Sequence, residues 1–236
     1  MQKIWVNKMF EKNKLGFLKK ENKKDNLPYE FFEKASKVFK TFPVKTMEDF
    51  NNALDEKEKE VQEKFKDILY ANKQLELLKE QKKESYERKQ NAEKRASSLL
   101  TVLMVVNGLF IAFLLNIVNK GLGIENFALS GLFYIMATIA LFFLVFAILY
   151  IIPVFMPTVS YATDDVFSDY SNETTDGVSK ELFFAQCLIV HTFIKKEFLT
   201  IEANSIGQRV YNACHSIRLS VIFFALSFII VVFSKF

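Results

Sequence analysis

Three long segments without charged residues restrict what this chain can fold into more than any other feature. Residues 97–118 and 127–155 contain no Asp, Glu, Lys or Arg, and residues 217–233 contain only Arg218, at the edge. A helix needs about 20 apolar residues to cross a hydrocarbon core of roughly 30 Å. Pro153 and Pro157 end the second segment, because proline cannot donate the hydrogen bond that continues a helix. The sequence therefore predicts an all-α membrane protein with transmembrane helices at 97–118, 127–155 and 217–233.

Charged residues gather before the first of these segments. Residues 1–96 carry 24 of the 31 Lys and Arg residues and 18 of the 27 Asp and Glu residues, and this excess of +6 suits anionic lipid or a charged partner. Basic residues are dense just before the first and third segments and sparse after them, where only Lys120 and Lys235 occur. The positive-inside rule then places the N-terminus and residues 156–216 in the cytoplasm and the C-terminus outside.

A long charged helix is predicted to lead into the first span. Residues 44–106 contain no Gly and no Pro, and Thr46 with Asp49 forms a possible capping box. We expect one helix to cover residues 46–96 and to continue into 97–118. Apolar residues recur every seven positions at Leu54, Val61, Ile68 and Leu75. This repeat indicates either a helix that packs on its own domain or a coiled coil that self-associates.

The other segments outside the spans are also mostly helical in pattern. Residues 1–45 are expected to form short helices, with one apolar face made by Tyr29, Phe32, Ala35, Val38 and Phe39. That face could pack on the long helix or dock a partner protein. Residues 156–180 form an acidic polar loop in this interpretation. Residues 181–216 form an amphipathic helix that could lie on the membrane surface or under the long helix, with one stripe made by Phe183, Cys187, Val190, Ile194, Phe198 and Ile201.

Residue patterns for catalysis are sparse. The chain has two His, two Cys and seven Gly, without a phosphate-binding glycine loop or metal-ligand spacing at Cys187 and Cys214. His191 is expected to be a packed or interfacial residue. Arg209 and His215 have the spacing of some helical ribonucleases, but His215 adjoins the membrane, where RNA has poor access. We therefore predict no enzyme activity, no cofactor, no metal and no direct binding of nucleic acid.

Polar residues inside the first span are the best candidates for a functional site. An amide in a bilayer needs hydrogen-bonding partners, which neighbouring helices supply, and a glycine allows close approach of those helices. The candidate interface or pore residues are Thr101, Asn107, Gly108 and Asn116. Asn107 could instead make one hydrogen bond between helices of the same chain. Candidate gating residues at the membrane boundary are Arg95, Arg209, His215 and Arg218.

The sequence of the membrane region resembles the membrane effectors of Pycsar anti-phage systems. The likeness covers about residues 90–236, and it begins in "EKRASSLLTVLMVVNG" with Glu93, Arg95, Ala96, Leu99, Leu100 and Gly108. "IIP" at 151–153 is similar to the end of their second span, and "ANSIGQRVYNACHSIRLSVIFFAL" at 203–226 is similar to the helix that leads into their third. SLATT-type membrane proteins of bacterial conflict systems resemble the chain about as well.

This resemblance implies a non-enzymatic effector that damages the bacterial inner membrane when infection is sensed. Its cytoplasmic region would be triggered by a cognate sensor protein or by a cyclic nucleotide. Homo-oligomerisation through the first span is predicted separately, from its polar residues Thr101, Asn107 and Asn116. The spans alone leave two other classes open. One is a membrane anchor or scaffold that recruits a soluble partner, and the other is a subunit of a channel or transporter.

Overall fold

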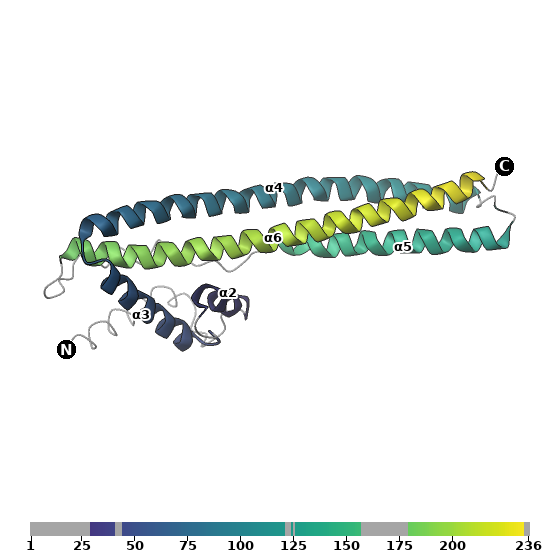
Figure 1. Cartoon of the computed structure of the whole chain (residues 1–236). Coiled ribbons are helices and arrows are strands. Elements are labelled where there is room, and N and C mark those ends of the chain that lie inside the picture. Colours follow the sequence, from purple (N-terminus) through teal and green to yellow (C-terminus); the bar gives the residue numbers. More distant parts are fainter. Residues whose placement is uncertain (1–28, 41–43, 121–123, 125, 157–178, 234–236) are drawn as a thin grey trace. The chain divides into compact units, whose positions relative to one another are not determined.

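Helices make up the regular structure of the computed structural model, which describes residues 29–40, 44–120, 124, 126–156 and 179–233. The elements are α2 (Tyr29–Phe39), α3 (Met47–Lys64), α4 (Ile68–Lys120), α5 (Phe127–Ile151), the 3-10 turn η1 (Ile152–Val154) and α6 (Lys180–Phe233), drawn in Figure 1. The described residues contain no strand. Three of the helices, α4, α5 with η1, and α6, are long and apolar enough to cross a membrane. The prediction of an all-α protein with three membrane-length helices is therefore confirmed.

The chain divides into two compact units. Their boundaries fall within helices, after Tyr86 in α4 and after Ile201 in α6. Unit 1 holds α2, α3 and the first parts of α4 and α6, and unit 2 holds the remainder of α4 and α6 together with α5. Both α4 and α6 thus contribute residues to each unit.

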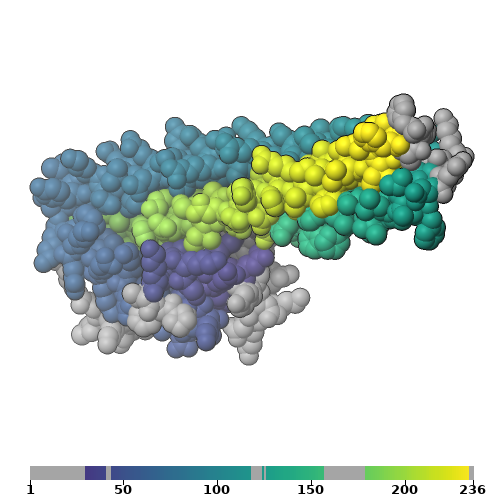
Figure 2. All heavy atoms as spheres, turned by 45° about the vertical axis from the view of Figure 1, so that its right-hand side comes forward, coloured from purple at the N-terminus to yellow at the C-terminus, as the bar shows by residue number. Residues whose placement is uncertain are grey.

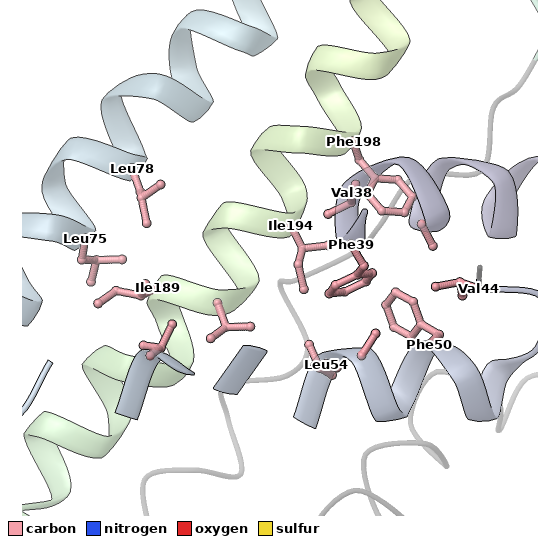
Figure 3. Close-up of a cluster of buried hydrophobic side chains, with 14 of the residues drawn as sticks. Val38, Phe39, Val44, Phe50, Leu54, Leu75, Leu78, Ile189, Ile194 and Phe198 are labelled. Carbon is pink, nitrogen blue, oxygen red and sulfur yellow. The ribbon is translucent and has the colours of Figure 1, made fainter. Parts of the chain in front are cut away.

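Unit 1 is organised around one apolar core to which all four of its helices contribute. Figure 3 shows side chains of α2 and α3 meeting those of α6, and side chains of α4 pointing toward Ile189. Phe39 and Phe50 pack edge to face with ring centroids 5.6 Å apart. The four residues of the seven-residue repeat all lie in this core or against it. Packing within the chain therefore accounts for the repeat, as the first of the two interpretations expected.

Most of the apolar faces predicted for the outer segments are found in this same core. On α2, Ala35, Val38 and Phe39 are buried, together with Phe31, which the sequence pattern did not single out. Four residues of the stripe predicted on 181–216 lie in this core or against it, at Val190, Ile194, Phe198 and Ile201, so the α6 part of unit 1 covers protein core. The predicted helices before residue 29 and the predicted acidic loop, except for its ends, lie outside the described residues.

The prediction of one unbroken helix from residue 46 into the first span is wrong at residues 65–67. Helix α3 ends at Lys64, and α4 begins at Ile68. The Asp67 carboxylate accepts a hydrogen bond of 2.8 Å from the Leu69 amide, as a capping residue does at a new helix start. The Gln186 side chain donates a hydrogen bond of 2.6 Å to the Phe65 carbonyl. This partner lies far away in the sequence, so the local pattern could not reveal the break.

Two other boundaries follow the sequence more closely. The capping box predicted at Thr46 is present, because the Thr46 hydroxyl accepts from the Asp49 amide and the Asp49 carboxylate accepts from the Thr46 amide. The helix predicted for 181–216 and the third span at 217–233 form a single helix, α6, without interruption.

Candidate functional site

The three helices of unit 2 enclose a packed apolar interior. Figure 1 shows α4, α5 and α6 running side by side in this unit, and Figure 2 shows side chains of α5 and α6 meeting along it. On α5 the buried positions recur every three or four residues, which gives one inward face, at Phe133, Ala137, Ala140, Leu144, Ala147 and Ile151. Phe110 and Phe224 fill one end of this interior, with ring centroids 5.1 Å apart. Side chains therefore occupy the space between the helices of one chain.

Small residues allow these helices to approach closely. Ala213, Ser220 and Ser227 are buried on α6 at intervals of seven residues. The Ser220 hydroxyl donates a buried hydrogen bond of 2.8 Å to the Ala140 carbonyl of α5. Such contacts are typical of membrane helices, where small side chains permit close packing and hydroxyls bond to a neighbouring backbone. Sequence reasoning missed this contact, although the seven-residue spacing of small residues on α6 was a signal for it.

The polar residues predicted in the first span lie on different sides of α4. Thr101, Gly108 and Asn116 are exposed, whereas Asn107 is half-buried. A helix turns by about 100° per residue, so Gly108 lies within roughly 20° of Thr101, and Asn107 lies about 120° away. Thr101 and Gly108 thus share an outer face, and Asn107 lies at the flank of the packed face formed by Ala96, Leu103 and Phe110. The structure does not bring the four candidates together as one site.

Hydrogen bonding also distinguishes these positions. The Thr101 hydroxyl donates to the Ser97 carbonyl at 3.3 Å and the Ser98 hydroxyl to the Lys94 carbonyl at 3.1 Å, so both are satisfied within α4. No hydrogen bond between described residues joins the Asn107 amide to another helix of unit 2. The alternative of one Asn107 hydrogen bond between helices of the same chain is therefore not found among these residues.

An ion pair between α4 and α6 is the main charged contact of unit 2. The Lys89 amine lies 2.7 Å from the Glu202 carboxylate and 3.9 Å from that of Glu93. The side chains of Lys89 and Glu202 are only 19% and 3% exposed. A charge this deeply buried needs an opposite charge, because leaving one partner alone in a low dielectric is costly. Neither residue was among the sequence candidates, because only the fold brings positions 89 and 202 together.

The four predicted boundary residues lack such contacts. Arg95, His215 and Arg218 are exposed and Arg209 is half-buried. No ion pair or hydrogen bond among the described residues involves any of the four. Their side chains are thus available to lipid headgroups or to water, in the way that long basic side chains at membrane boundaries are used.

Cys187 and His191 are buried one helical turn apart on the unit 1 part of α6. Burial lowers the pKa of His191 to about 4, so the imidazole is neutral near pH 7. Burial, together with the nearby Glu58, raises the pKa of the Cys187 thiol well above its usual range. A protonated, covered thiol is a poor nucleophile, so Cys187 acts as a small apolar residue in this setting.

Comparison of the chain with protein-family models, curated proteins and solved structures finds no match.

Proposed function

We propose that this protein is a membrane-permeabilising effector of bacterial anti-phage defence. The observation that carries the proposal is the makeup of α4 and α6. Each contains a membrane-length apolar segment, and each also supplies core residues of unit 1. A rearrangement of the unit 1 core would therefore act on two of the helices that enter the bilayer, without an intervening flexible linker. The resemblance to Pycsar effectors adds support in the membrane region.

Permeation in this proposal takes place between copies of the chain. The interior of unit 2 is filled by large side chains such as Leu103, Phe110 and Phe133, so a water path within one chain would require their removal. The outer face of α4 offers Thr101 and Gly108 instead, a small polar residue and a residue without a side chain. Helices that meet through such residues can approach closely, and a ring of them can present hydroxyls to water. We therefore propose homo-oligomers assembled through α4.

Unit 1 is the sensing region of the proposed effector and lies in the cytoplasm, where a partner protein or a nucleotide messenger would reach it. This orientation rests on the distribution of Lys and Arg around the spans. Reporter fusions at residue 170 and at Phe236 should report opposite compartments of the inner membrane. Reports from the same compartment would remove the third span and contradict this topology.

Gly108→Leu tests the assembly step. A Cβ placed on Gly108 meets no atom within 4 Å, so the larger side chain should leave the fold of one chain intact. It should block close approach of a second α4 and should abolish both oligomers in mild detergent and depolarisation of cells. Gly131→Leu on α5 is the matched control, because a Cβ there also meets nothing within 4 Å. Equal effects of the two substitutions would contradict an interface specific to α4.

Depolarisation itself is measured with a potential-sensitive dye in cells that carry the gene with its neighbours and are infected with phage. Wild type should depolarise the membrane before lysis. Asn107→Leu should weaken this response at equal protein level, because the Asn107 amide, at the flank of the packed face, can form a hydrogen bond to another helix only in a rearranged state, and the variant removes that bond. If wild type never depolarises the membrane under infection, the effector proposal is wrong.

A membrane scaffold that recruits a soluble partner is the second candidate, and one observation favours it. Leu69 and Tyr70 of unit 1 are 72% and 66% exposed, and Leu77 is also exposed two turns further along α4. Apolar groups outside a bilayer often mark protein interfaces. The test is to capture a partner protein with wild type and with the double variant Leu69→Ser, Leu77→Ser. If the variant loses the partner, and the cells never depolarise, the scaffold or a channel subunit is favoured over the effector.

A further inference from the structure

Helix α3 is attached to α4 by only three residues that are not helical. Its inner face packs in the unit 1 core through Phe50, Ala53, Leu54 and Val61. Figure 3 shows Phe50 and Leu54 in the same core as Ile194 and Phe198 of α6. Residues 65–67 form the connection, and the Gln186 hydrogen bond to the Phe65 carbonyl fixes it to α6. The helix is thus a separate element, docked on α6 and joined to α4 through a short connection that can act as a hinge.

A carboxyl group lies within this docked arrangement. The Oε1 atom of Glu58 on α3 is shielded from solvent and has no hydrogen-bond partner among the described residues. Glu58 also contributes, after burial, to the raised pKa of the Cys187 thiol on α6. Burial, with a smaller contribution from the nearby Asp55, raises the pKa of Glu58 from 4.5 to about 7.

The positive charge of the neighbouring Lys57 is directed elsewhere. The neighbouring Lys57 amine lies 2.6 Å from the Glu60 carboxylate and 5.2 Å from the centre of the Phe193 ring. The charged group that acts on Glu58 from its own helix is Asp55, and the titratable group close to it on α6 is Cys187. Within the described residues, neither α2 nor α4 places a charged group that influences the Glu58 pKa. An ionised Glu58 is therefore uncompensated while α3 is docked.

We propose that α3 is a proton-controlled latch, in which a protonated Glu58 holds α3 on α6 and an ionised Glu58 favours its release about residues 65–67. The sign follows from linkage. The docked carboxyl group binds its proton more tightly than an exposed one, so the contribution of Glu58 to docking is largest at low pH and is lost as the pH rises from about 4.5 to about 7. Cytosolic pH changes near neutrality would thus change the docked fraction. The proposal does not depend on the effector function.

Alkylation of Cys187 measures release of α3 in the full-length protein. A Cys214→Ala background leaves Cys187, which is buried, as the reporter thiol. Its rate of reaction with a neutral thiol reagent is compared between this protein and its Glu58→Gln variant at pH 5.5 and pH 8. Because both proteins contain the same thiol and the same His191, the ratio of their rates cancels the other titrations. A two-state estimate predicts that this ratio rises roughly 20-fold from pH 5.5 to pH 8.

Glu56→Gln is the control, because Glu56 is exposed on the same helix. The ratio of the alkylation rates of the unchanged protein and Glu56→Gln should therefore stay constant with pH. Hydrogen exchange of the α3 amides provides a second readout, since a released helix of 18 residues is only marginally stable in water. Exchange of these amides should speed up as the pH rises more strongly in wild type than in Glu58→Gln. In Glu58→Leu, as in Glu58→Gln, release of α3 should not depend on pH through residue 58. Equal pH dependence in wild type and Glu58→Gln by both measurements would overturn the proposal.

Discussion

The buried ion pair between Lys89 and Glu202 provides the sharpest test of what holds unit 2 together. The perturbation is Lys89→Met, which keeps a long apolar stem and removes the charge. Because the Glu202 side chain is only 3% exposed, the variant leaves a carboxylate in a place that water hardly reaches. The variant then has to hydrate, protonate or move that carboxylate, and each of these disturbs the contact between α4 and α6.

Burial sets the size of the effect. Breaking one partner of a buried pair costs about 3–5 kcal/mol, and we expect about 3 kcal/mol here because Lys89 is itself 19% exposed. For a chain of this size, that loss corresponds to a fall in melting temperature of about 6–12 °C. The double variant Lys89→Met with Glu202→Met should recover most of the loss, since replacing both charges with apolar groups removes the buried carboxylate that has lost its Lys89 partner.

Thermal unfolding of detergent-solubilised protein, followed by fluorescence-detected size exclusion, checks these values. Lys37→Met on α2 is the matched control. Its amine lies 2.6 Å from the Glu33 carboxylate, but the two side chains are 56% and 49% exposed, so the cost should be about 0.5 kcal/mol or less. Equal shifts for Lys89→Met and Lys37→Met would refute the argument that burial decides the strength of this contact, and so would a double variant less stable than Lys89→Met alone.

Four further predictions concern other contacts of the fold. Ser220→Ala should lower the free energy of unfolding by about 1 kcal/mol through loss of its bond to the Ala140 carbonyl, whereas the exposed Ser98→Ala should change the melting temperature little. Thr46→Ala should cost about 1 kcal/mol at the start of α3. Hydrogen bonds from the Lys45 backbone and the Thr46 side chain lower the pKa of Asp49 below its ordinary value of 3.8. The stabilisation of α3 by the Asp49 carboxylate should therefore be lost as the pH falls below 3.8, which faster proteolysis of α3 would reveal. Burial lowers the pKa of His191 from 6.5 to about 4, so stability should fall by about 3 kcal/mol as the pH drops from 6.5 to 4, and His191→Gln should remove this loss in a pH series of melting temperatures.

Local chemistry explains the parts of this protein that the sequence alone determines. Residues 97–118 and 127–155 are recognisable as spans because burying uncharged side chains in a bilayer depends on the segment itself and not on its neighbours. The capping box at Thr46 is equally local, since its partner Asp49 is three residues away. The apolar stripes on α2 and α6 follow from helical periodicity, and most of their residues lie in the unit 1 core or against it.

Tertiary structure decided everything that depends on a distant partner. The break at residues 65–67 is fixed by Gln186, and the charge on Lys89 becomes a buried contact only because Glu202 lies opposite it. The first span shows the same division. Its pattern predicted polar positions at Thr101, Asn107, Gly108 and Asn116, but only the packing of α4 against α5 and α6 shows that Thr101 and Gly108 face outward while Asn107 lies at the flank of the packed face. A sequence records which residues share a helix face, whereas the neighbouring helices determine which face is covered.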